Sequence, residues 1–315
     1  MSGQTTSMRA EKPPSNGKAG RAALVALAFL VYLGFLLYPF GRMDPRLDFA
    51  GPALGMPAMA ALYLWHGRCS AGPWALAAFC ASAMAIAGVA EVASLSTGFP
   101  FGRFAYTDRM RTTLFGVPAI VLAAYAIVGY WCWRTAAILA GRNGAGGVLH
   151  VGAATVLMVA WSVVADPVRS TVEQSWIWPE GGPLLGVPLS NLGGWTLTSA
   201  AIFTAFAVIE RRFPGDARGL PRGLGICPLM YGALAFEYLV HPLVPAPDRI
   251  VQAGGVAYSS DAIYAAVAVL ALLTMVPAAT AAAIIAWRGE RHTPHRGKAP
   301  SLRLSGPGRG FRRCA

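Results

Sequence analysis

Charged residues are absent from seven long stretches of this chain, and this absence constrains the fold more than any other feature. Each stretch is close to or longer than the ~20 residues that a helix needs to cross the apolar core of a bilayer. They span residues 22–41, 49–67, 69–90, 112–133, 143–165, 181–209 and 262–287. An eighth stretch, 223–247, is interrupted only by Glu237. The sequence therefore predicts an all-α polytopic membrane protein, a bundle of about eight transmembrane helices within a range of seven to nine.

The composition argues against a soluble alternative. At 315 residues the chain could hold two soluble domains, but only 13% of its residues are charged and 55% are hydrophobic. We expect one transmembrane helical domain over residues 21–288, between disordered basic tails at residues 1–20 and 289–315. No cleavable signal peptide is expected, because a long polar tail precedes the first span.

The net charge of +12 is better explained by topology than by binding to nucleic acid. With eight spans and a cytoplasmic N-terminus, the cytoplasmic segments would carry 19 of the 26 Lys and Arg residues, and the opposite face the remaining 7. This asymmetry fits the positive-inside rule. We therefore expect an integral protein of the plasma membrane, with both termini in the cytoplasm and membrane lipid as a partner.

Prolines and charged residues set the expected helix boundaries. The first helix should cover about residues 22–38, and a loop should separate it from a second helix that starts near Pro57. Later helices are expected over 73–91, over 118–134 with Trp131 and Trp133 as an interfacial belt, over 148–165, up to Arg212, around Glu237, and up to Arg288.

Two segments between these helices, residues 91–118 and 166–195, are not ordinary polar loops. They combine aromatic residues, carboxylates and several Gly and Pro breaks, which suits segments that cap the mouth of a helix bundle. The sequence P-F-G-R at 39–42 recurs 61 residues later at 100–103, and the same offset relates L-G-M-P to F-G-V-P at 115–118. This repeat is compatible with a duplication or with coincidence.

Two acids close uncharged runs next to these segments, and they are the catalytic candidates: Glu91 and Asp166. Partial loss of water favours the protonated form of a carboxylic acid, and a protonated acid can deliver a proton to an alkene. Each acid could instead mark a membrane boundary, and Asp166-Pro167 could simply cap a helix. Glu237 and His241, one helical turn apart, are secondary candidates that could equally be an internal polar pair, and Glu173 is a third.

Aromatic and polar side chains in the two segments are candidates for substrate binding. Aromatic faces stabilise cations, so a carbocation pocket is one interpretation of W-I-W at 176–178, and interfacial anchoring is the other. Anchoring could suffice for Trp195. Asn191 and Tyr106 could orient a water or satisfy loop backbone, and Arg103 could pair with an acid or extend to the interface. The full set is Phe101, Arg103, Tyr106, Trp176, Trp178, Asn191 and Trp195.

Signatures of cofactor binding are missing from the sequence. It has no phosphate loop, dinucleotide fingerprint, nucleophile elbow or histidine-rich metal cluster, and its five cysteines include no C-x-x-C pair. We therefore expect chemistry without a cofactor and without a metal.

The sequence E-V-A-S-L-S-T-G-F-P-F-G-R-F-A-Y, followed by F-G-V-P, D-P and W-I-W-P-E-G-G-P-L-L-G-V-P-L-S-N-L-G-G-W, resembles the membrane carotenoid biosynthesis family that contains the CruF-type carotenoid 1,2-hydratases. The resemblance is best over residues 85–200. It implies addition of water to the terminal 1,2 double bond of an acyclic or monocyclic carotenoid, with a tertiary alcohol as the product. It does not imply which carotenoid, or which residue is the acid.

Two alternatives stay open at this stage. A lycopene-cyclase-type isomerase would share the protonation step and differ only in what captures the cation. A non-catalytic transporter, or a scaffold for other carotenoid enzymes, would also place charged residues at a bundle mouth, although transporters more often have broken helices at the membrane midplane in both halves.

Overall fold

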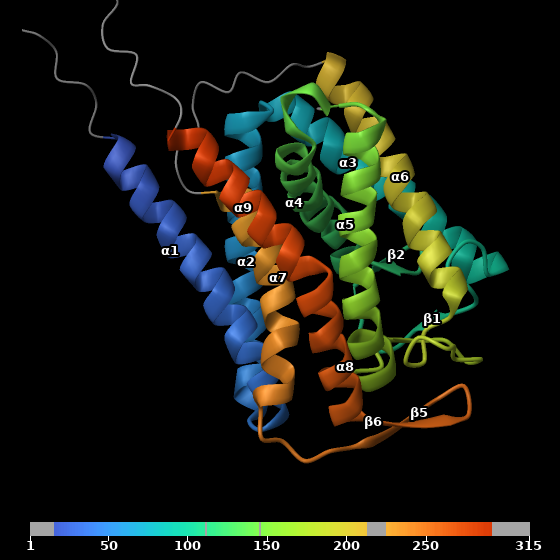
Figure 1. Cartoon of the computed structure of the whole chain (residues 1–315). Helices are drawn as coiled ribbons and strands as arrows, with labels where there is room; N and C mark the ends of the chain where they lie inside the picture. Colours follow the sequence, from blue (N-terminus) through green and yellow to red (C-terminus); the bar gives the residue numbers. More distant parts are fainter. Residues whose placement is uncertain (1–15, 111, 145, 213–224, 292–315) are drawn as a thin grey trace, which may run out of the picture.

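The structure is a computed structural model that describes residues 16–110, 112–144, 146–212 and 225–291. It is a helical bundle (Figure 1), as expected, and seven of its segments are long and apolar enough to cross a membrane. Most of the two expected tails, residues 1–15 and 292–315, lies outside the described residues. The helices are α1 (Asn16–Leu37), α2 (Pro45–Ser70), α3 (Pro73–Thr97), α4 (Ala119–Gly144), α5 (Val148–Asp166), α6 (Leu189–Arg212), α7 (Ile226–Val240), α8 (Ser260–Leu273) and α9 (Met275–Arg291).

Short strands and turns gather at one end of the bundle (Figure 1). They are β1 (Ala105–Tyr106), β2 (Thr113–Leu114), β3 (Val117–Pro118), β4 (Trp176–Ile177), β5 (Ile250–Ala253) and β6 (Val256–Ser259), with the helical turns η1 (Tyr38–Arg42), η2 (Pro167–Val172) and η4 (His241–Leu243). β1 pairs with β4, β2 with β3, and β5 with β6, all antiparallel. We call this the loop end. The beginning of α1 and the end of α9 lie at the other end of the bundle (Figure 1).

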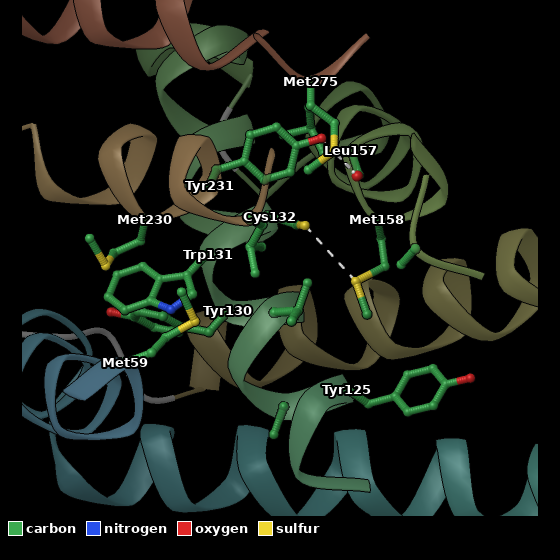
Figure 2. Packing of buried hydrophobic residues seen from close by; sticks show 14 of the residues in the cluster. Met59, Tyr125, Tyr130, Trp131, Cys132, Leu157, Met158, Met230, Tyr231 and Met275 are labelled. Carbon is green, nitrogen blue, oxygen red and sulfur yellow. Dashed lines mark hydrogen bonds between the residues drawn. The ribbon is translucent and has the colours of Figure 1, made fainter. Parts of the chain in front are cut away.

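Helix α4 runs through the centre of the bundle. Four consecutive residues, Tyr130 to Trp133, are fully buried, as expected for a helix that is apolar on all sides. Figure 2 shows Trp131 between Met59 and Met230, and Cys132 facing Met158 at 3.9 Å between the two sulfurs. The prediction of an interfacial belt at Trp131 and Trp133 is therefore wrong, because neighbouring helices surround this part of α4.

Helix α2 starts twelve residues before the expected position at Pro57. Asp44 caps it by accepting a hydrogen bond from the Arg46 backbone N–H at 2.9 Å, and Pro45 occupies the first turn, where a missing N–H costs nothing. Pro52 and Pro57 lie inside this helix. The expected loop over residues 39–53 is thus η1 followed by the beginning of α2.

Other helix ends also differ from the prediction. α3 continues six residues beyond Glu91 and ends at Gly98, which has a left-handed backbone (φ 83°). α5 continues past Asp166 as the π-helical turn η2, since Pro167 lacks the N–H that a regular α-helix would use. α6 begins at Leu189, seven residues before the expected loop ends. The last predicted span is divided at Thr274 into α8 and α9.

Helices α1 and α2 touch backbone to backbone. A Cβ atom at Gly34 would lie 2.5 Å from the Cα of Gly55, and one at Gly51 would lie 2.8 Å from the Cα of Tyr38. Only glycine allows two membrane helices to approach this closely. We call Gly34, Gly51 and Gly55 the glycine seam.

Two tight turns at the loop end share one geometry. Both residues of each turn have a positive φ. The angles are 53° at Phe115 and 82° at Gly116 in the first turn, and 54° at Leu185 and 92° at Gly186 in the second. Each turn joins a Leu to a Val in an antiparallel pair and is followed by Pro and a helix. This is the pattern of a type I′ turn. The structural repeat therefore has an offset of 70 residues. The repeat at 61 is not structural, because Leu54–Pro57 is helical while Phe115–Pro118 is a hairpin turn.

Candidate active site

Glu91 lies on α3, buried within the bundle at the loop end. Its Oε1 accepts a hydrogen bond from the Tyr125 hydroxyl of α4, and its Oε2 accepts one from the Tyr106 hydroxyl of β1, both at 2.9 Å. Both oxygens of this carboxyl are therefore occupied by phenols from two different elements. Burial, followed by the charge of Glu91, raises the pKa of the Tyr106 phenol, so this hydroxyl stays protonated and can donate.

Asp166 is the last residue of α5 and is also buried. Its Oδ2 accepts a hydrogen bond from the side-chain amide of Asn191, on the first turn of α6, at 2.5 Å. Ser162 and Trp195 lie next to the same carboxyl. The Ser170 hydroxyl donates to the Asp166 carbonyl at 2.6 Å, which fixes the backbone where α5 becomes η2.

An aromatic cluster connects the two carboxyls. Tyr125, which holds Glu91, stacks on Trp195, which lies beside Asp166, with ring centroids 4.7 Å apart and 19° between the planes. Trp161 and Phe101 approach Trp195 edge-on, at 5.7 and 6.1 Å. Trp195 is buried, so the prediction that interfacial anchoring could explain it is wrong.

The two unusual segments cover this cluster from the loop end. Pairing of β1 with β4 sets Tyr106 opposite Trp176, and their rings meet edge-on at 6.2 Å. The indole N–H of Trp178 donates to the carbonyl of Phe101 at 3.2 Å, and both side chains are buried. Three of the seven residues predicted to bind substrate lie beside Glu91 or Asp166: Tyr106, Asn191 and Trp195. Three others contact their neighbours in the cluster: Phe101, Trp176 and Trp178. The exception is Arg103, which is exposed and makes no described contact with either acid.

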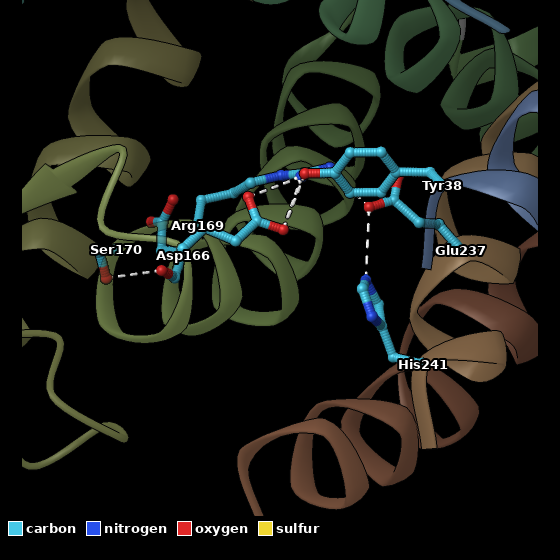
Figure 3. A network of polar contacts seen from close by, with 7 residues as sticks. Tyr38, Asp166, Arg169, Ser170, Glu237 and His241 are labelled. Carbon is cyan, nitrogen blue, oxygen red and sulfur yellow. Dashed lines mark hydrogen bonds and ion pairs between the residues drawn. The ribbon is translucent and has the colours of Figure 1, made fainter. Parts of the chain in front are cut away.

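The secondary candidates form a separate polar cluster around Arg169 (Figure 3). The Arg169 guanidinium donates to Glu173 at 2.9 Å, to Glu237 of α7 at 2.5 Å, and to the Tyr38 hydroxyl of η1. His241 lies 3.8 Å from Glu237 and stacks on Tyr264 of α8. This cluster ties η2 to α7 and η1, and Asp166 lies on the same turn of the chain as Arg169. Glu237 and His241 are thus part of a network that holds helices together.

Sequence reasoning missed several residues of these clusters, among them Tyr125 and Arg169. Tyr125 lies in the middle of an uncharged run, where a tyrosine looks like an ordinary core residue. Its one signal is position, because it follows Pro118 by seven residues as Trp195 follows Pro188. Arg169 has a clearer signal, since Glu173 follows it at i+4.

Metal ligands are not grouped in the part of the chain that the structure describes: it holds no cluster of three or more His, Cys, Asp and Glu side chains that could bind an ion. The candidate site consists of two buried carboxyls, their phenol and amide partners, and aromatic rings. Such a site can transfer protons and stabilise positive charge.

Comparison with known proteins identifies the family of this chain. Residues 51–246, more than half of the chain, match the family described as carotenoid biosynthesis protein. Comparison with curated proteins and with solved structures gives no match. The matched region contains both carboxyls, the aromatic cluster, and Arg169 with its partners Glu173 and Glu237. The chain belongs to the carotenoid biosynthesis protein family.

Proposed function

We propose that this protein is a carotenoid 1,2-hydratase, which adds water to the terminal 1,2 double bond of an acyclic ψ end. The observation that carries the proposal is the pair of buried carboxyls, Glu91 and Asp166, on either side of one aromatic cluster. Membership of the family supplies the carotenoid. The resemblance of the two loop segments to the CruF-type hydratases supplies the reaction.

The reaction balances with water as the only second reactant. One carboxylic acid gives its proton to C2, the C1–C2 π bond supplies the electrons of the new C–H bond, and C1 becomes a tertiary cation. A water oxygen then forms a bond to C1 and loses a proton to the other carboxylate. No carbon is oxidised or reduced overall, so the reaction as written uses no redox cofactor. The proposal assigns stabilisation of the cation to the aromatic cluster that contains Trp195 and Tyr125, because aromatic faces attract positive charge.

We assign the roles from the two phenols on Glu91, although Asn191, Ser162 and Trp195 also lie beside the carboxyl of Asp166. Both oxygens of Glu91 already accept from phenols, an arrangement that suits an ionised carboxylate and hence the base that deprotonates water. Asp166 then supplies the proton, with Asn191 holding its carboxyl in place.

Solvent deuterium distinguishes these roles. In heavy water, reversible protonation at C2 introduces deuterium into recovered substrate. We expect Glu91→Gln to keep this exchange while forming no alcohol, and Asp166→Asn to lose both. The opposite pattern would exchange the two roles.

The position of the site suits a long polyene. Glu91 and Asp166 lie at the loop end of the bundle, so only one end of an acyclic or monocyclic carotenoid has to reach them. The rest of the molecule can stay in lipid alongside the apolar helices.

Pigment analysis tests the function. A lycopene-accumulating host that expresses this chain should form a carotenoid with a tertiary hydroxyl group, and purified protein should do the same after dialysis against a chelator. A cyclic hydrocarbon product would favour the isomerase. No change in pigment, with the protein present in the membrane, would favour a transporter or scaffold.

We also propose that the loop end faces away from the cytoplasm. The support is the 19-to-7 division of basic residues, together with the bundle in which the described ends of α1 and α9 lie opposite the loops (Figure 1). Single cysteines placed at Thr107 and at Arg288 should label from opposite sides of sealed membranes. Labelling of both from one side would contradict this topology.

A further inference from the structure

A polar cavity of about 760 Å³ opens at the loop end, on the other side of the Arg169 cluster from the aromatic site. Its volume is in the range of pockets that hold small molecules or cofactors. Chain segments far apart in the sequence build it, and its lining residues are Tyr38, Gly41, Arg42, Asp108, Arg109, Glu173, Ser175, His241, Arg249 and Tyr264. The proposed hydration uses none of them.

Three arginines from three separate segments line this cavity: Arg42 of η1, Arg109 between β1 and β2, and Arg249 before β5. Arg42 is the most enclosed, and its guanidinium lies over the Tyr264 ring, 4.2 Å from the centroid. It donates to the Val244 carbonyl at 2.9 Å, while its Nε is buried and has no hydrogen-bond partner. The guanidinium groups of the arginines that line the cavity are strong hydrogen-bond donors for an oxyanion.

His241 adds a second donor that lacks a partner. Its side chain is only 2% exposed, and neither ring nitrogen has a hydrogen-bond partner among the described residues. The 3.8 Å between its Nε2 and the nearest oxygen of Glu237 is too long for a hydrogen bond. A buried imidazole without a partner is costly unless a ligand or water completes it.

The charges favour an anion over a cation. Arg169 is shared between Glu173 and Glu237, so Glu173 counts among the acids of the lining together with Asp108. Asp261 lies 3.9 Å from Arg42 but is itself half-exposed. Three arginines against two lining carboxylates leave an excess of one positive charge.

Exposed apolar side chains that are close in sequence to the lining residues favour a lipid over a soluble anion. Met43, next to Arg42, is 53% exposed, and Leu243, two residues after His241, is 75% exposed. The cavity also lies beside the end of α1 and the beginning of α8, both candidate membrane spans. We propose that this cavity binds the phosphate-bearing headgroup of a membrane phospholipid, with the acyl chains passing Met43 and Leu243.

Native mass spectrometry of the purified full-length chain in detergent tests this proposal. The probes are phosphatidylglycerol and diacylglycerol with the same acyl chains, which differ in the phosphate headgroup. The test variant is Arg109→Gln with Arg249→Gln, because these two side chains are exposed and their loss should leave the bundle folded. Arg46→Gln is the matched control, an exposed arginine of α2 that does not line the cavity.

We expect the wild type and Arg46→Gln to retain one phosphatidylglycerol in preference to diacylglycerol. The double variant should bind it about tenfold to a hundredfold more weakly, since charge-assisted hydrogen bonds are lost. His241→Phe, which keeps a ring against Tyr264, should also weaken retention. Equal retention of the two probes, or no effect of the double variant, would overturn the proposal. Displacement of the lipid by inorganic phosphate would contradict the proposal of a lipid ligand and would assign the cavity to free phosphate.

Discussion

The α3–α4 half and the α5–α6 half of the bundle contain corresponding parts in the same order, but they hold their carboxyls in different ways. In each half an acid near the end of the first helix is followed by a strand, a type I′ turn, a proline and a second helix. Tyr106 and Trp176 correspond at the offset of 70 residues and pair across β1 and β4, and Tyr125 and Trp195 correspond and stack. The candidate site lies between the two halves.

The difference lies in what surrounds each acid. Glu91 is within a regular α-helix and is held by two phenols, whereas Asp166 is at the junction with a π-helical turn and is held by an amide. The turn of the first half projects outward, with Phe115 87% exposed, while a Cβ at Gly186 in the second would contact Thr171 and Ala253. One half is therefore anchored to the rest of the bundle and the other presents an apolar tip. We infer that the two halves have complementary roles, although the acids themselves do not correspond, because Glu91 and Asp166 are 75 residues apart rather than 70.

The largest expected effect tests whether both halves supply a catalytic group. Glu91→Gln and Asp166→Asn each keep the shape of the side chain and remove its ability to accept or give a proton, and such groups contribute ~10²–10⁴-fold to a rate. Each variant should therefore form no detectable alcohol in a lycopene-accumulating host, with unchanged amounts of protein in the membrane. Near-normal product from both would move the site to Glu237 and His241.

The second prediction compares the two turns. Gly116→Ala and Gly186→Ala both place a Cβ in a left-handed conformation, at a cost of ~1–2 kcal/mol. Overpacking against Thr171 and Ala253 should add about 1–3 kcal/mol at Gly186 alone. Thermal unfolding in detergent should show a clearly lower midpoint for Gly186→Ala. Gly152→Ala on α5, where a Cβ meets no atom within 4 Å, is the control and should not destabilise the protein.

A smaller effect is expected from the phenol that connects the halves. Tyr125→Phe keeps the stack on Trp195 and removes the hydrogen bond to Glu91, so the rate of hydration should fall about tenfold. Rates in purified protein would measure this, with Tyr231→Phe as a control, because that hydroxyl donates to the distant carbonyl of Leu157. An unchanged rate in Tyr125→Phe would mean that Tyr106 alone holds the carboxyl.

The smallest effect concerns the aromatic partner in the second half. Trp195→Phe retains an aromatic face and should be milder than Trp195→Leu, which removes it. A cation–π contribution of ~0.5–2 kcal/mol corresponds to a difference of about 2- to 30-fold between the two variants. Equal rates would indicate that Trp195 positions Asp166 without stabilising a cation.

Much of the fold follows from where charge is absent. The uncharged runs locate the membrane spans because a bilayer tolerates few charged side chains. The predicted helix ends are wrong where polar residues continue a helix beyond its uncharged run. Asp44-Pro45 starts α2 in a segment that looked like a loop. α3 continues past Glu91 to Thr97, and the hydroxyls of Ser96 and Thr97 donate to the Ala93 carbonyl in its last turn.

The site was predictable in its acids and aromatics but not in its connections. Glu91, Asp166, Trp178 and Asn191 are chemically conspicuous in an apolar chain, and the structure brings them together. Tyr125 is not conspicuous, since its role depends on a partner 34 residues away. The network of Arg169 depends on Tyr38 and Glu237, 131 and 68 residues away, and no local pattern encodes such distances.

The glycine seam between α1 and α2 has a consequence for biogenesis. α2 is not among the seven segments apolar enough to qualify as a span, yet it is packed against one that is. Backbone contact at Gly34 and Gly55 means that the two helices can enter the bilayer as one hairpin, with α1 supplying the hydrophobicity that α2 lacks. A bulky side chain at position 34 would separate the pair and leave α2 to partition on its own.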